Sequence, residues 1–252
     1  MAKARLIPTM LLSQGRLVKG RRFADHEDAG NPVTTAKIYN DQMADEIVIL
    51  DIEATAAQRA PDLATLSALT ARCFVPVTFG GGVASLETAA AVLRAGADKV
   101  AVNAAVLARP ALIGEMAARF GSQAIVVAID VLETRNGARV ATDNGRRATA
   151  HDPVAWAQEV EAAGAGEVLL TSVEREGRRC GPDLAGIRRV AEAVTVPVIG
   201  HGGIGRLEDF VSTITEGGAA AVAAGRIFQF ADNNLIKVRR YMRQHQVDVR
   251  VN

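Results

Sequence analysis

The chain has 252 residues, of which 29 are Lys or Arg and 28 are Asp or Glu, so its formal net charge is +1. That balance argues against a protein that coats nucleic acid or is drawn to a membrane by charge. Its 49% hydrophobic and 23% charged content is typical of a soluble globular protein, and no run of about 18 apolar residues predicts a transmembrane helix.

Short apolar runs alternate with Ala-rich amphipathic segments along the chain. The pattern predicts strands near residues 5–11, 46–52, 76–79, 99–103, 124–130, 167–172, 197–200 and 220–224. It predicts helices at 32–44, 61–71, 86–95, 110–119, 153–163, 184–193, 207–216 and 233–244. Asn31, Ser85 and Asp152 are candidate N-caps. Eight βα units in about 250 residues favour an α/β fold, a (β/α)8 TIM barrel forming a single domain over residues 1–252.

Two connections exceed the roughly 2–6 residues usual between a strand and a helix. Residues 12–31 follow the first strand, and residues 131–151 follow the fifth. Within the second, Asn136-Gly137 predicts a hairpin turn. Barrels place their active sites at the C-terminal ends of the strands, so we expect both loops to act as lids over a substrate.

The two halves of the sequence repeat each other. Segments beginning at Glu46 and Glu167, at Gly81 and Gly202, and at Gly96 and Gly217 each lie 121 positions apart. One constant offset over three motifs predicts a barrel built from two (β/α)4 half-barrel repeats.

Gly-Gly pairs at 81–82 and 202–203 each follow a strand and precede a helix. Glycine allows close backbone approach to an anion, and a helix N-terminus favours negative charge. Together with residues 103–104 and 224–225 at the ends of the next strands, the pairs predict two opposed phosphate sites and a substrate with a phosphate at each end. The alternative is that these glycines serve tight turns alone.

Residues 200–205 also match the dinucleotide fingerprint G-x-G-x-x-G. The fingerprint belongs in the first βα unit of a nucleotide-binding half, whereas this copy lies in the seventh unit. We therefore do not predict a Rossmann site, and we expect no cofactor.

Candidate acid–base groups end two of the predicted strands. Asp130 follows a buried-looking run that would raise its pKa, so we predict that it is catalytic. Asp51 is predicted to position substrate, and Thr171 and Ser172 are its counterparts in the repeat. The alternative for either aspartate is a loop-capping role.

Four charged residues stand at the opposite ends of strands, namely Arg5, Glu46, Lys99 and Glu167. Two cations and two anions there could form a paired ring across the barrel floor, since buried charges persist mainly when paired. Ordinary solvated charges at strand starts are the alternative. The two cysteines fit a reducing cytoplasm, and the four histidines show no metal-ligand spacing, so no metal is expected.

The segments GRLVKG (15–20), DEIVILDI (45–52), FGGGV (79–83), ADKVAVN (97–103), RFGSQAIVVAID (119–130) and GAGEVLLTSVEREG (164–177) resemble the cyclase subunit of imidazole glycerol phosphate synthase, the HisF family. The resemblance runs from Arg5 to Arg250. It implies a barrel that receives ammonia from a HisH-like glutaminase at its N-terminal face. It also implies that the barrel uses this ammonia on a bisphosphate, N-(5′-phosphoribulosyl)formimino-aminoimidazole carboxamide ribotide.

The resemblance also implies residue roles. The four strand-start charges match the family's ammonia gate, and Asp98 matches a residue at the glutaminase interface. The positions that match substrate or phosphate contacts are Lys19, Gly82, Asn103, Gly177, Gly203, Ala224 and Gly225. Gly81 and Gly202 are added from the glycine pattern.

Departures from the family pattern leave the activity open. The family has catalytic aspartates at the ends of strands one and five, but the first position here is Leu11. Ala104 and Glu176 change two phosphate-site positions, and His201 replaces a small residue. The alternative function is a divergent paralogue that relays ammonia to a third enzyme, as in surface-sugar amidination.

Overall fold

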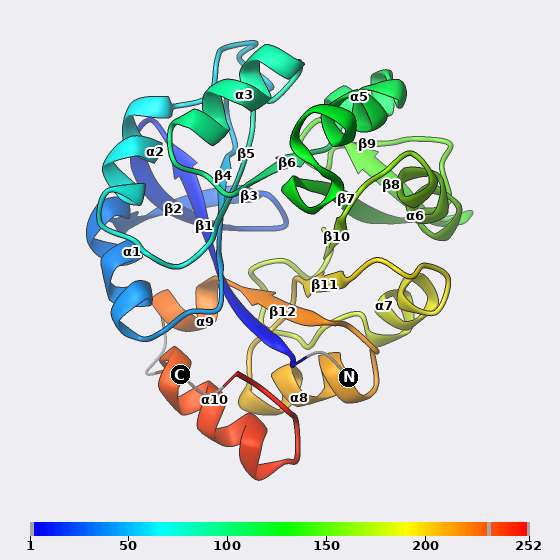
Figure 1. Cartoon of the computed structure of the whole chain (residues 1–252). Helices are drawn as coiled ribbons and strands as arrows, with labels where there is room; N and C mark the ends of the chain where they lie inside the picture. The colour runs from blue at the N-terminus through cyan, green and yellow to red at the C-terminus, as the bar shows by residue number, and fades with distance from the viewer. Residues whose placement is uncertain (1–2, 231–232, 251–252) are drawn as a thin grey trace.

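The computed structural model describes residues 3–230 and 233–250. In these residues eight parallel strands close into a barrel, each pairing with its neighbours, and Figure 1 shows the helices arranged outside it. In order around the barrel they are β1 (Arg5–Ser13), β4 (Ile47–Asp51), β5 (Val77–Gly80), β6 (Lys99–Val102), β7 (Ile125–Thr134), β10 (Glu167–Ser172), β11 (Val198–His201) and β12 (Ala221–Ala224). The predicted (β/α)8 barrel is confirmed. Residues 1–2, 231–232 and 251–252 of the predicted domain range lie outside the described residues.

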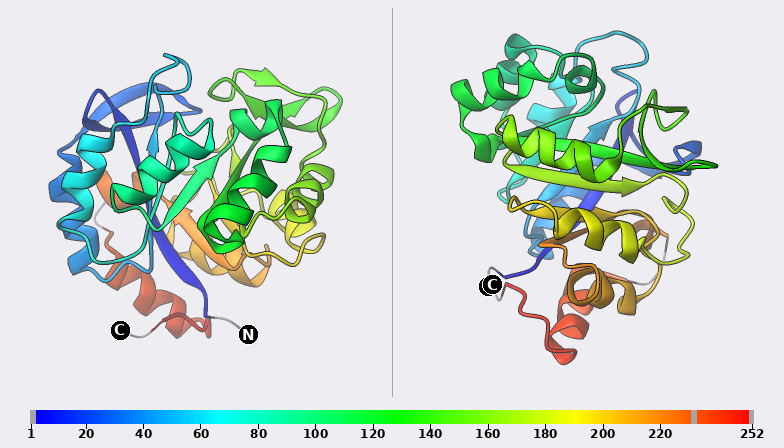
Figure 2. Two further views of the ribbon diagram at one scale, coloured as in Figure 1. Left: turned by 45° about the horizontal axis from the view of Figure 1, so that its top comes forward. Right: turned by 90° about the vertical axis from the view of Figure 1, so that its right-hand side faces the viewer.

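The helices of the described chain cover the outer face of the barrel, as both views of Figure 2 show. They are α1 (Pro32–Asp41), α2 (Leu63–Thr70), α3 (Leu86–Arg94), α4 (Ala104–Ala108), α5 (Ala111–Phe120), α6 (Pro153–Ala162), α7 (Leu184–Ala191), α8 (Leu207–Thr215), α9 (Arg226–Gln229) and α10 (Leu235–Gln244), with a 3₁₀ turn η1 (Ser122–Ala124). The predicted caps are confirmed, because the side chains of Asn31, Ser85 and Asp152 accept backbone N–H groups of α1, α3 and α6.

Inward-facing side chains of the strands form layers along the barrel axis. The middle layers are apolar and rich in small side chains: Ile7, Val48, Ala101, Val126, Leu169, Ile199, Ala221 and Ala223. On β1 the inward positions run from Arg5 through Ile7 and Thr9 to Leu11, that is, from a charged floor through an apolar interior to the mouth. A larger apolar core lies between the strands and the helices.

The expectation of a long loop after the first strand is wrong. Residues 12–31 form an antiparallel hairpin of β2 (Arg16–Arg21) and β3 (Ala24–Gly30), and β2 pairs with the end of β1. Leu17 and Val18 are buried in this arrangement, which anchors an otherwise polar hairpin to the barrel.

The loop after the fifth strand also contains strands. β7 continues directly into β8 (Gly137–Thr142), which pairs in turn with β9 (Arg147–Ala148). The predicted hairpin is confirmed, but its turn residues are Arg135 and Asn136, because Thr134 pairs with Gly137 across the turn. In the part of the chain described, no helix has the length and apolar character needed to cross a membrane.

Candidate functional site

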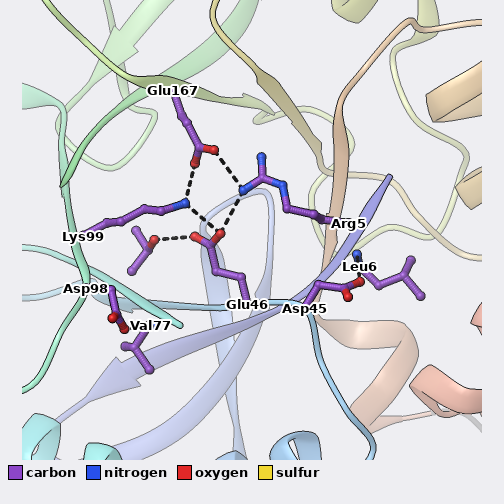
Figure 3. Close-up of polar contacts among 9 residues, drawn as sticks. Arg5, Leu6, Asp45, Glu46, Val77, Asp98, Lys99 and Glu167 are labelled. Atoms are coloured by element: carbon purple, nitrogen blue, oxygen red, sulfur yellow. Dashed lines mark hydrogen bonds and ion pairs between the residues drawn. The ribbon is translucent and has the colours of Figure 1, made fainter. Parts of the chain in front are cut away.

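The floor of the barrel carries a closed ring of four ion pairs (Figure 3). Arg5 Nη1 lies 2.9 Å from carboxylate oxygens of both Glu46 and Glu167. Lys99 Nζ lies 2.9 Å from Glu46 and 2.8 Å from Glu167. The hydroxyl of Thr78 donates to the other Glu46 oxygen at 2.5 Å. The sequence-predicted ring therefore forms, and its alternating charges offset the cost of removing them from water.

Asp98 lies at the same end of the barrel (Figure 3), one residue before β6. Its carboxylate accepts the backbone N–H of Val77 at 2.8 Å, which ties the starts of β5 and β6 together, while the residue stays exposed. Phe74, in the connection that leads into β5, is 87% exposed. Asp98 and Phe74 are therefore both exposed at the N-terminal end of the barrel.

The opposite end opens into a cavity of about 930 Å³. Strand ends, both hairpins and the connection between β4 and α2 line it. The sequence-predicted site residues on its wall are Asp51, Gly81, Gly82, Asn103, Asp130 and Thr171. Leu11 lines the same cavity. The topology thus brings together, at the C-terminal ends of the strands, six candidates that are far apart in the sequence.

Asp130 reaches this cavity near the point where β7 leaves the barrel. Asn103 Nδ2 donates to its carboxylate at 2.8 Å. Burial raises the pKa of Asp130 from 3.8 to about 7, the Asn103 hydrogen bond opposes this, and the charge of Glu176 raises the pKa further. A carboxyl group with a pKa near neutrality can both donate and accept a proton.

This raised pKa predicts a pH-dependent stability difference between the wild type and Asp130→Asn. Because the folded pKa exceeds the unfolded one, wild-type stability falls as pH rises from about 4 to about 7, whereas asparagine does not titrate. One pKa unit corresponds to about 1.4 kcal/mol, and water in the cavity reduces the effect. The free energy of unfolding of the variant minus that of wild type should therefore be roughly 2 kcal/mol larger above pH 7 than at pH 4. Urea unfolding of both proteins across that range measures it, and a constant difference would contradict a raised pKa.

Asp51 is held by Arg59, a residue that the sequence analysis did not single out. The guanidinium donates two hydrogen bonds of 2.7 Å to the carboxylate, and the backbone N–H of Ala54 donates a third at 3.2 Å. Arg59 also lines the cavity. The bidentate pair fixes the segment after β4 at the rim of the cavity, so Asp51 orders the loop as well as facing the cavity.

The two Gly-Gly turns have similar backbones. Gly81 and Gly82 have φ of +98° and +71°, and Gly202 and Gly203 have +96° and +89°. A Cβ on Gly81 would lie 2.0 Å from the Asp51 carbonyl oxygen, so tight packing by itself requires glycine there. Both explanations of the glycines, phosphate binding and tight turns, fit this geometry.

Two of the second group of predicted phosphate residues, Gly177 and Gly225, lie against the β2–β3 hairpin. A Cβ on Gly177 would lie 2.1 Å from the Gly20 carbonyl oxygen, and one on Gly225 would lie 2.0 Å from Lys19 Nζ. The predicted residues that do not line the large cavity are Lys19, Ser172, Gly177, Gly202, Gly203, Ala224 and Gly225. Ser172 lines a separate cavity of about 160 Å³.

Lys19 is fully buried, and within the described residues its Nζ has no hydrogen-bond partner. Burial lowers its pKa to about 8, Glu176 raises it, and Arg226 lowers it. Nη1 of Arg226 is also buried and has no hydrogen-bond partner among the described residues. Arg226 Nη2 lies 3.5 Å from a carboxylate oxygen of Glu27, so only its Nη1 is left over. Two buried nitrogen atoms of positively charged side chains thus lack an acceptor, which makes this region suited to an anion. Sequence reasoning missed Arg226, although its position directly after Gly225 was a usable signal.

His201 lies inside the barrel, just below the mouth. Its Nδ1 is 3.2 Å from Thr171 Oγ1, and its Nε2 is 3.2 Å from Thr9 Oγ1 and 3.7 Å from a carboxylate oxygen of Glu176. Burial lowers the pKa of the imidazole, the charge of Glu176 raises it, and Lys19 lowers it. No group of three or more His, Cys, Asp or Glu side chains suited to a metal occurs in the described part of the chain.

A closed parallel barrel with a titratable carboxyl group and paired glycine turns at its mouth defines a (β/α)8 protein whose candidate active site occupies the C-terminal ends of its strands. The model of the histidine biosynthesis protein family matches residues 5–233. Imidazole glycerol phosphate synthase subunit HisF of Hyphomonas neptunium is 46% identical over 239 residues, covering 95% of each chain. The HisF subunit of Anoxybacillus flavithermus is 46% identical over 252 residues, covering 99% of this chain and all of that one. The chain belongs to the HisF family of histidine biosynthesis proteins, which confirms the resemblance seen in the sequence.

Proposed function

We propose that this chain is a HisF-type synthase subunit that uses ammonia on a bound bisphosphate. The reaction is ring closure and cleavage, giving imidazole glycerol phosphate and aminoimidazole carboxamide ribotide. Both relatives are named as this synthase subunit, and this chain aligns with nearly their full length. One observation carries the proposal: the four-charge ring and the Asp130 cavity lie at opposite ends of one apolar column.

The floor supports ammonia entry from a HisH-like glutaminase. Ammonia is small, and the Ala-rich middle layers leave an interior with few polar groups to retain it. Arg5, Glu46, Lys99 and Glu167 act as the gate, because a molecule entering the axis must pass between them. The exposed Phe74 and Asp98 at the same end are suited to docking the partner.

The mouth supports a substrate with two phosphates. One phosphate binds at Gly81, Gly82 and Asn103 on the cavity wall. The other binds at the group around Gly177, Gly203 and Gly225, where the unpartnered Nζ of Lys19 and Nη1 of Arg226 supply positive charge. Movement of the β2–β3 hairpin gives that second phosphate access. The two free thiols, Cys73 and Cys180, suit a cytoplasmic protein.

Leu11 supports a second candidate function. An alkyl side chain can neither donate nor accept a proton, and here it lines the same cavity as Asp130. In this alternative the barrel binds the glutaminase and relays ammonia to a third enzyme without closing an imidazole ring.

Turnover of the bisphosphate by the purified chain with an ammonium salt separates the two functions. The cyclase proposal predicts formation of both products, and it predicts that glutamine replaces the ammonium salt once a HisH glutaminase is added. Leu11→Asp, assayed alongside, shows how much rate a carboxylate at that position adds. Absence of both products from wild type, with the bisphosphate bound, would overturn the cyclase proposal and favour relay.

A further inference from the structure

The imidazole of His201 contacts side chains from strands on both sides of its own. Thr171, on the neighbouring strand β10, contacts one ring nitrogen, and Thr9 contacts the other from β1, two strands away on the opposite side. The strand between β11 and β1 presents Ala223 beside His201, and this small side chain leaves room for the ring. The imidazole therefore crosses toward the strand whose mouth position is Leu11.

His201 also shares one row of the barrel with Asp130. Asp130 pairs in register with Thr171, and Thr171 pairs in register with His201. All three residues line the large cavity. Thr171 thus stands between His201 and Asp130 in the strand register, and its hydroxyl contacts the imidazole.

The chemistry of the proposed function needs two proton-transfer groups. When ammonia converts a carbonyl carbon into an imine, a C–N bond forms and the C–O bond breaks. Two protons leave the nitrogen, and two reach the oxygen that departs as water. Asp130 can deliver one proton to the oxygen and later take one from the nitrogen, so a second group must make the complementary pair of transfers.

We propose that His201, acting through the hydroxyl groups of Thr171 and Thr9, supplies the second proton-transfer function that the side chain of Leu11 cannot provide. His201 accepts the first proton from the nitrogen while Asp130 donates to the oxygen. His201 then returns its proton to the oxygen while Asp130 accepts the second from the nitrogen, so both groups end as they began. His201 is a positioning and relay residue for this step, and the inference rests on the proposed function.

The surroundings of His201 suit this role. Among the described residues, the charged groups that face it are Glu176, at 3.7 Å, and Lys19. Burial and Lys19 keep the resting imidazole neutral and able to accept a proton, while the Glu176 carboxylate stabilises the imidazolium formed during the reaction.

His201→Gln tests the inference, because glutamine retains hydrogen-bonding capacity and does not titrate. We expect kcat for ammonia-dependent turnover to fall by about 10²-fold, with KM within about 3-fold, and the acidic limb of the kcat–pH profile to disappear. Leu11→Asp in the His201→Gln background should restore activity, a rescue that a merely structural role would not allow. His245→Gln, the same change on the exposed end of α10, is the matched control.

Glu176→Gln provides a second measurement if His201→Gln fails to fold. Glu176 raises the pKa of both His201 and Asp130, so both limbs of the profile should move to lower pH. Wild-type turnover with a profile unchanged by these variants overturns the inference and leaves the proposed function standing. A wild type that binds the bisphosphate without turnover overturns the proposed function, and the inference with it.

Discussion

Replacing Asp130 with asparagine is expected to lower ammonia-dependent turnover of the bisphosphate by about 10²–10⁴-fold. Asparagine has nearly the same shape, and its carbonyl oxygen can still accept the hydrogen bond that Asn103 donates at 2.8 Å. What it loses is the exchangeable proton of a group whose pKa lies at about 7. The rate loss should therefore fall on kcat and leave KM nearly unchanged.

Steady-state kinetics with saturating ammonium salt measure this effect. Asp41→Asn makes the same chemical change in an exposed ion pair on α1, and we expect it to leave kcat unchanged. A reduction below about 3-fold in Asp130→Asn would show that another group carries the proton. Urea unfolding of the same variant at the pH of the assay shows whether it is folded there, so a loss of activity is separated from a loss of structure.

The sequence predicted the barrel well because its strands are buried on both faces. The run from Ile125 to Ile129 is continuously apolar, a pattern that a solvent-exposed strand does not show. Helix starts were equally predictable where a side chain caps the helix by accepting backbone N–H groups, as at Asn31 and Asp152. Short-range signals of this kind do not depend on the rest of the fold.

The elements that the sequence analysis missed lack such signals. β3 consists largely of exposed polar residues, and it is a strand because it pairs with β2 rather than because it buries a face. The helices α4 and α9 have five and four residues, too few to show a helical period.

Within the candidate site, strand-end positions were predictable and side-chain environments were not. Asp130 and Asn103 follow from the rule that barrel strands present their C-terminal ends to one face. The burial of Lys19 could not be foreseen, because charged residues are rarely fully buried and nothing local marks this one. The approach of Glu176 to His201 depends on how the connection after β10 packs against the end of β11.

The ring of four ion pairs at the barrel floor predicts a second large effect, which is on the stability of the fold rather than on the rate of turnover. We expect Glu46→Gln to lower the free energy of unfolding by about 3 kcal/mol, because Arg5 and Lys99 would then share one carboxylate, that of Glu167. Glu46 is 2% exposed, so water cannot replace the lost charge. Urea unfolding at neutral pH measures the loss.

Two further variants separate buried charge imbalance from a general effect of removing a carboxylate. Glu115→Gln breaks the exposed pair with Arg109 by the same chemical change, and we expect it to cost less than about 1 kcal/mol. Adding Lys99→Met to Glu46→Gln leaves one cation, Arg5, paired with one anion, Glu167. If charge balance holds the ring together, the double variant should be more stable than Glu46→Gln alone, and additive losses would refute that explanation.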